Sequence, residues 1–159
     1  MATAPSRVFK SFLKAKNLNT KGPVSVTAAT LTLDESTHNG RWVLLDASGG
    51  VAVALPAATG SGATYKLMVS TASNATVIST TSAGTFFGGY VSNDIGDSSA
   101  GLADFMPAAA GNNTLSPTTA GGGGLKGDWF QFVDVDVDEW LVSGATTGAT
   151  DPTNRFSTT

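Results

Sequence analysis

Residues 128–143 read DWFQFVDVDVDEWLVS and carry the clearest secondary-structure pattern in the chain. Aromatic and β-branched residues, which favour β-strands, crowd residues 128–133 and 139–143. A run of alternating aspartate and valine separates these two segments. The pattern predicts a β-hairpin with its tip at residues 134–138.

Short bursts of the same residue types recur through the first half of the chain. Alternation is clearest at residues 51–55, where valine and leucine alternate with alanine and so face opposite sides of a strand. The further strands predicted lie at residues 24–33, 41–46, 64–70 and 75–80. Strands at this spacing predict an all-β fold, a compact sandwich or small barrel of about seven to nine short strands.

The composition excludes several other classes of protein. The chain has 159 residues, of which 13% are charged, and alanine, threonine, glycine and serine make up about half of it. A helical bundle would need more leucine, glutamate, lysine and arginine. No apolar run approaches the ~20 residues of a membrane-spanning helix. Since cysteine is absent, disulfides and thiolate metal sites are excluded.

Charge divides the chain into three parts. Five of the nine basic residues precede residue 22, and no acidic residue precedes Asp34. The predicted organisation is a basic N-terminal arm at residues 1–23, a β domain at 24–145 and a tail rich in glycine and threonine at 146–159. The net charge of −3 argues against nucleic-acid binding, which needs a basic surface.

The arm has an amphipathic pattern. Residues 6–18 read SRVFKSFLKAKNL, with Val8, Phe9, Phe12 and Leu13 at helical spacing and lysines elsewhere. The pattern predicts an extended or short-helical arm that docks on an acidic partner. A frayed, solvated terminus is the alternative. The arm lacks the apolar stretch of a secretory signal peptide, so we expect synthesis in the cytoplasm.

The chain offers little catalytic chemistry. His38 is its only histidine and is predicted to lie exposed in a turn. No serine occupies a G-x-S-x-G motif, and neither residues 60–62 nor residues 121–127 complete a phosphate-binding glycine motif. We therefore expect no enzyme activity, no cofactor and no metal.

Two other groups of residues have alternative interpretations. Asp134, Asp136 and Asp138 share one face of a strand and are predicted to form a solvated hairpin tip. A contact for a basic partner and a cation site are the alternatives, although the EF-hand pattern is not met. The tryptophans at positions 42, 129 and 140 are predicted to lie in the core, with a sugar-stacking platform as the alternative.

Four segments together resemble a known protein family. They are LLDASGGV at residues 44–51, VALPAATGSGATYK at 53–66, GGLKGDW at 123–129 and WLVSG at 140–144. They are similar to segments of the small head decoration, or cement, proteins of tailed bacteriophages, over roughly residues 24–145. The basic arm and the acidic hairpin tip depart from the family pattern.

The resemblance implies a virion structural protein with an all-β body. Such proteins assemble usually as trimers on the outer capsid surface and reinforce contacts between capsomers. The implied partners are the major capsid protein and further copies of this chain as a homotrimer, without nucleic acid or membrane. The alternative is a carbohydrate- or receptor-binding module of a phage tail fibre or bacterial surface. The residues predicted to bind the capsid are Arg7, Phe9, Lys10, Phe12, Leu13 and Lys14.

Overall fold

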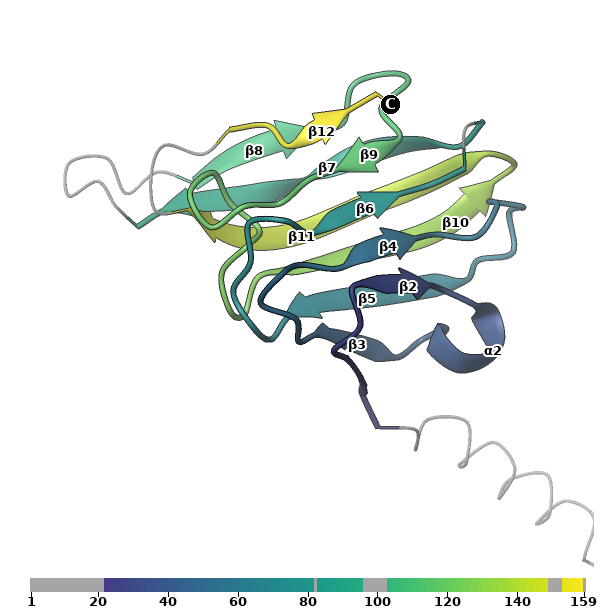
Figure 1. Ribbon diagram of the computed structural model, residues 1–159. Coiled ribbons are helices and arrows are strands. Elements are labelled where there is room, and N and C mark those ends of the chain that lie inside the picture. Colours follow the sequence, from purple (N-terminus) through teal and green to yellow (C-terminus); the bar gives the residue numbers. More distant parts are fainter. Residues whose placement is uncertain (1–21, 82, 96–102, 149–152, 159) are drawn as a thin grey trace, which may run out of the picture.

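The computed structural model describes residues 22–81, 83–95, 103–148 and 153–158, and they fold as a β-sandwich (Figure 1). This confirms the predicted all-β class. The seven-stranded sheet contains, in order across it, β1 (Val24–Val26), β3 (Trp42–Leu45), β5 (Thr64–Val69), β10 (Trp129–Asp136), β11 (Glu139–Gly148), β7 (Thr85–Asp94) and β8 (Ala103–Pro107). The five-stranded sheet contains β12 (Phe156–Ser157), β9 (Thr114–Leu115), β6 (Val77–Ser79), β4 (Ala52–Ala54) and β2 (Thr30–Thr32). A short helix, α2 (Glu35–His38), joins β2 to β3.

The described part of the chain holds twelve strands, more than the seven to nine predicted. One reason is that residues 24–33, predicted as one strand, divide into β1 and β2, which lie in opposite sheets. β8 and β9 lie in a region rich in glycine and alanine, where the sequence has little periodicity. β11 extends to Gly148, and β12 lies within the segment predicted as a tail.

The first six strands alternate between the two sheets. β1, β3 and β5 are parallel neighbours in the seven-stranded sheet, and β2, β4 and β6 are parallel neighbours in the five-stranded sheet. The chain therefore winds around the core from one sheet to the other and back. The antiparallel hairpin of β10 and β11 follows later and confirms the predicted hairpin. Its tight turn places Asp138 in the left-handed region, with φ at 60°.

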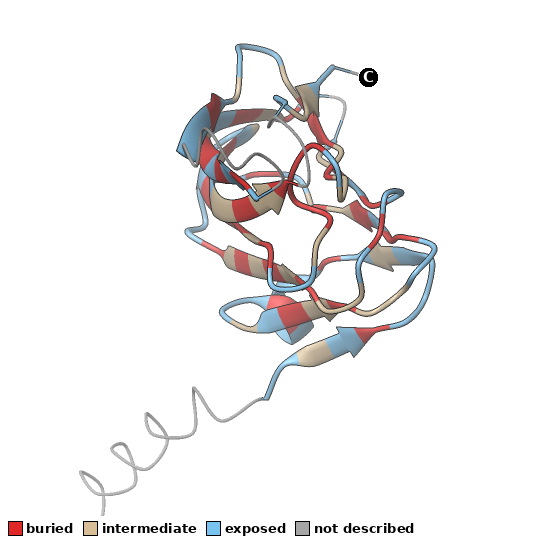
Figure 2. Ribbon diagram, turned by 90° about the vertical axis from the view of Figure 1, so that its left-hand side faces the viewer, coloured by how far each residue is buried: buried red, intermediate tan, exposed pale blue. Residues whose placement is uncertain are grey.

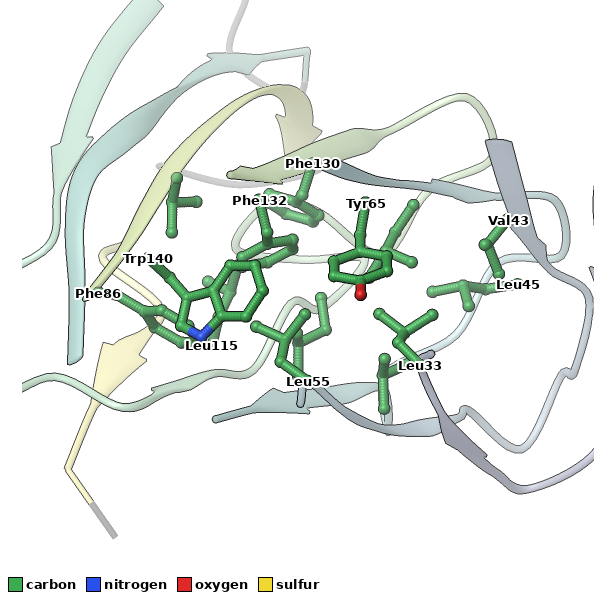
Figure 3. Packing of buried hydrophobic residues seen from close by; sticks show 14 of the residues in the cluster. Leu33, Val43, Leu45, Leu55, Tyr65, Phe86, Leu115, Phe130, Phe132 and Trp140 are labelled. Atoms are coloured by element: carbon green, nitrogen blue, oxygen red, sulfur yellow. The ribbon is translucent and has the colours of Figure 1, made fainter. Parts of the chain in front are cut away.

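The core lies between the sheets and is rich in aromatic rings (Figure 3). Phe132 packs against Phe86 with ring centroids 5.5 Å apart, and Tyr65 packs against Trp140 at 5.7 Å. Trp140 is fully buried, which confirms its predicted place in the core. The alternation at residues 51–55 is also confirmed, because the valines and the leucine are buried while the alanines are not.

A run of four glycines, residues 121–124, is buried beside this core. Gly124 accepts a hydrogen bond from the backbone N–H of Ser73 (2.9 Å) and donates one to the carbonyl of Thr118 (3.1 Å). A side chain at Gly124 would collide with the backbone at Ser73 and Thr118. Glycine is required there because three backbone segments approach one another closely.

Candidate interaction surface

The second face of the seven-stranded sheet is open to solvent and largely apolar. Buried and exposed residues alternate along the strands (Figure 2), and the residues that point away from the core lie in register across the sheet. One such row runs through Leu44, Met68, Trp129, Ala145, Val91 and Phe105, on six neighbouring strands. A second row runs through Val133, Leu141 and Phe87. These nine residues, with Trp42, form what we call the outer apolar face.

Several large side chains of the outer apolar face are in contact with water. Phe105 is 59% exposed, Phe87 is 40% exposed and Val91 is 39% exposed. Val135 of β10, beside this face, is 40% exposed. Single exposed apolar residues are common on proteins, but apolar rows in register across a sheet form a candidate interaction site. The register row between the two apolar rows is more polar and includes Lys66.

Two tryptophans lie at one end of this face. Trp42 and Trp129 meet edge to face, with ring centroids 6.2 Å apart and planes at 86°. The Lys66 ammonium lies 5.9 Å from the centre of the Trp42 ring. The prediction of core positions is wrong for these two tryptophans. The inward positions of their strands belong instead to Val43 and Phe130, which are buried.

A groove of about 310 Å³ opens beside Trp129. Its lining includes Ala145 and Thr147 of β11 and Asn93 of β7, with Lys126 from the loop before β10. An aromatic ring, an amide, a hydroxyl and an ammonium group thus line one groove. Such a set of groups suits a polar ligand with one flat apolar side.

Asp128 also lines this groove. Its carboxylate accepts hydrogen bonds from the backbone N–H of Leu125 (2.9 Å) and Thr147 (2.8 Å) and from the Thr147 hydroxyl (3.0 Å). Burial raises the pKa of Asp128, although these hydrogen bonds act to lower it. The carboxylate is therefore a fixed part of the loop, which it holds against β11.

The hairpin tip differs from its prediction at Asp134. This residue is only 2% exposed, because it lies on the inward face of β10 beyond Phe132. Its carboxylate accepts hydrogen bonds from the backbone N–H groups of Thr59 (2.9 Å) and Gly60 (2.7 Å) and from the Ser61 hydroxyl (2.7 Å). Burial acts to raise the pKa of Asp134, but these hydrogen bonds together lower it. The prediction of a solvated tip is thus wrong for Asp134, which instead anchors the loop at residues 59–61.

The other two aspartates of the row lie elsewhere in the hairpin. Asp136 is exposed, and Asp138 is partly buried in the turn. Within the described ranges, no three His, Cys, Asp or Glu side chains gather as a group that could hold a metal ion.

His38 is buried, so the predicted exposed position is wrong. Its Nδ1 accepts a hydrogen bond from the backbone N–H of Asp34 (3.1 Å). The Asp34 carboxylate accepts from the Ser36 hydroxyl (2.6 Å) and from the Thr37 backbone N–H (2.8 Å), and these bonds lower its pKa to about 2. Serine, histidine and aspartate therefore meet here as the N-terminal cap of α2, and the serine bonds to the aspartate instead of the histidine.

The six residues predicted to bind the capsid lie outside the described residues. They are Arg7, Phe9, Lys10, Phe12, Leu13 and Lys14. The structure therefore brings together a different set, the outer apolar face, of which the sequence interpretation singled out only Trp42 and Trp129, as an alternative sugar-stacking platform. A signal for it exists at residues 129–135, where apolar residues occupy both alternating positions. A strand with one solvated face would carry polar residues at every second position.

Comparison of the chain with protein-family models, with curated proteins and with solved structures found no match. No helix among the described residues is long and apolar enough to cross a membrane.

Proposed function

We propose that this protein is a virion structural protein that binds the outer surface of an icosahedral phage capsid and reinforces contacts between capsomers. Its partners in this role are the major capsid protein and further copies of the chain in a homotrimer. The protein catalyses no reaction in this role. It is made in the host cytoplasm and ends on the outside of the virion.

The outer apolar face is the observation that carries the proposal. The core between the sheets is already complete without it, so this second apolar surface favours assembly with other proteins. The resemblance to phage decoration proteins supports the same role. Its four segments contribute to β3, β4, β5, β10 and β11 and their turns.

The uneven charge adds a means of attachment. Residues 1–21 carry five basic groups and no acidic group, whereas the rest of the chain carries four basic and twelve acidic groups. In the proposed role, Phe9, Phe12 and Leu13 bury in a groove of the shell. Arg7, Lys10 and Lys14 face carboxylates there. Several arms in one trimer give avidity without a tight single site.

Copy number per particle tests the proposed function directly. Quantitative protein analysis of purified virions should find hundreds of copies, in simple ratio to the major shell protein. A handful of copies would place the protein in the tail. Its absence from virions would contradict both assignments.

Removing the arm tests how the protein attaches. Deletion of residues 2–16 should leave the body folded, with an unchanged melting temperature, because the described core begins at residue 24. Binding to capsids that lack the protein should be lost. If the truncated protein binds capsids with unchanged affinity, the arm is not the anchor.

The groove beside Trp129 favours carbohydrate binding as a second candidate function. Trp42 and Trp129 are at least partly open to solvent, and aromatic rings of this kind can stack on the apolar face of a sugar. A glycan array would test this, with Trp129→Ala as the variant and Val77→Thr, on the other sheet, as the control. Binding that only Trp129→Ala removes would support a receptor-binding module. An array with no signal above background would count against it.

A further inference from the structure

We propose that the outer apolar face lies against the capsid shell, so that the body and the arm attach to one partner surface. This inference rests on the proposed function and names the part of the body that makes the contact. It assigns to the shell a flat apolar surface with a carboxylate opposite Lys66. Three features of the structure support it.

The first feature is the point at which the arm leaves the body. The Arg41 guanidinium donates two hydrogen bonds to the carbonyl of Gly22 (2.9 and 2.6 Å) and a third to the carbonyl of Thr37 (2.9 Å). Arg41 directly precedes Trp42, which belongs to the outer apolar face. The arm therefore starts at a corner of this face, and Arg41 fixes its starting point.

The length of the arm fits a shared surface. Residues 14–21 separate Leu13 from Gly22 and can extend over at most about 30 Å. Leu13 must then bind within about that distance of the corner at Trp42, and Phe9, four residues further along the arm, within about 45 Å. A shell surface that holds the arm is thus within reach of the outer apolar face.

The second feature is a cation within the face, beside Trp42. Lys66 lies on β5 between Trp42 of β3 and Gln131 of β10 in the register of the sheet. In the described part of the molecule, no carboxylate pairs with Lys66. A second copy laid face to face would bring a second Lys66 into the same contact. A shell surface with a carboxylate opposite Lys66 would pair with this cation.

The third feature is the contrast with the other sheet. The outward positions of β2, β4 and β6 hold Thr30, Thr32, Ala52, Ala54 and Ser79, and Val77 is their one larger apolar residue. That face offers little apolar area to bury. It therefore suits exposure to water on the outside of the particle.

A binding experiment with particles stripped of this protein tests the inference. The variant combines Phe87→Ser, Val91→Thr and Phe105→Ser, three exposed positions of the outer apolar face. The matched control is Val77→Thr, which is 37% exposed on the other sheet. Wild type and control should bind with equal affinity, and the triple variant should bind about tenfold or more weakly. Circular dichroism and thermal melting check that the variant is folded.

A second variant guards against misfolding of the triple variant. Phe105→Lys changes the most exposed of these side chains, so it should leave the fold intact and still weaken binding by placing a cation against an apolar surface. Unchanged particle binding by a folded face variant would overturn the inference.

Two further outcomes separate the alternatives. If the wild-type protein forms oligomers in sedimentation that the triple variant abolishes, while particle binding is unchanged, a second copy covers the face and the inference is wrong. If the wild-type protein fails to bind stripped particles at all, the proposed function itself fails and the inference fails with it.

Discussion

The two sheets of the sandwich present very different faces to solvent. The seven-stranded sheet carries tryptophan, phenylalanine, leucine and valine on its outer face, in rows that continue across strands. The outward positions of β2, β4 and β6 in the five-stranded sheet carry mainly threonine, alanine and serine. Both sheets contribute their inner faces to the same core.

The difference indicates that the inner and outer faces of the seven-stranded sheet contribute differently to folding. An antiparallel or mixed sheet with one buried face usually places polar or small residues on the other, as the five-stranded sheet does. The seven-stranded sheet keeps apolar residues on both faces, although only one of them packs into the core. Its outer face therefore contributes little to folding, and we attribute its apolar composition to the binding of a partner.

Truncating one inner and one outer aromatic residue tests whether the two faces of the sheet differ in how much they stabilise the fold. Phe132→Ala empties a fully buried position of β10 and should lower the free energy of unfolding by about 3–5 kcal/mol. Phe87→Ala truncates a side chain that is 40% exposed and should lower it by less than about 1 kcal/mol. Urea unfolding at neutral pH measures both. A loss of similar size for Phe87→Ala would mean that the outer apolar face stabilises the fold itself.

The end of β10 extends this test to a polar side chain, because the inward position there is occupied by Asp134. Asp134→Asn removes the charge that receives the bonds from Thr59, Gly60 and Ser61, and it should cost about 1–3 kcal/mol at pH 7. Since folding lowers the pKa of Asp134, its contribution is present above the unfolded pKa of about 3.9. It is lost as the pH falls through the lower pKa of the folded state.

Urea unfolding at several pH values measures this effect. The difference between wild type and Asp134→Asn should shrink as the pH falls below about 4. Asp136→Asn is the matched control, because Asp136 is exposed on the same strand, and it should change stability by less than about 0.5 kcal/mol. A difference that stays constant down to pH 2 would show that the charge of Asp134 is not the cause.

The smallest effect concerns the tryptophan pair. Trp42→Phe should change the free energy of unfolding by only about 0.5–1 kcal/mol, because Trp42 is 39% exposed and its edge-to-face contact with Trp129 is weak. The same variant should clearly reduce the fraction of tryptophan fluorescence that acrylamide quenches. Trp140→Phe, in the core, should raise the quenchable fraction, because it removes fluorescence that acrylamide does not reach. Unchanged quenching in Trp42→Phe would mean that this end of the face is covered.

Alternation along a strand predicts which residues share a face, but not which face is buried. At residues 129–135, the sequence correctly separates Trp129 and Val133 from Phe130 and Phe132. Both sets are apolar, so composition alone does not choose between them. The core position of Trp140 is predicted correctly, because the opposite face of β11 carries no apolar side chain of comparable size among the described residues.

Residues whose environment comes from distant parts of the chain are harder to predict. Asp134 shares its face with Phe132 and is buried because Thr59, Gly60 and Ser61, more than 70 residues away, supply its hydrogen-bond donors. Nothing in residues 128–143 indicates those donors. The capsid-binding residues of the arm stay predictions.

The alternating path of the chain was also beyond prediction from sequence patterns. Asn39 and Gly40 form a turn dipeptide that favours a hairpin between antiparallel neighbours. In the structure this turn, together with α2, carries the chain from β2 in one sheet to β3 in the other. Turn residues in the sequence therefore indicate where the chain changes direction, but not which strands become neighbours.

This path ties the two sheets into one cooperative unit. Each of the first six strands is followed by a strand in the opposite sheet, so neither sheet can complete its parallel half alone. β3 cannot be peeled from its neighbours without also pulling on β2 or β4 across the core. A force applied at the arm therefore acts first on β1, an edge strand of one sheet, and next on β2, an edge strand of the other, so it loads the two layers of the sandwich in turn.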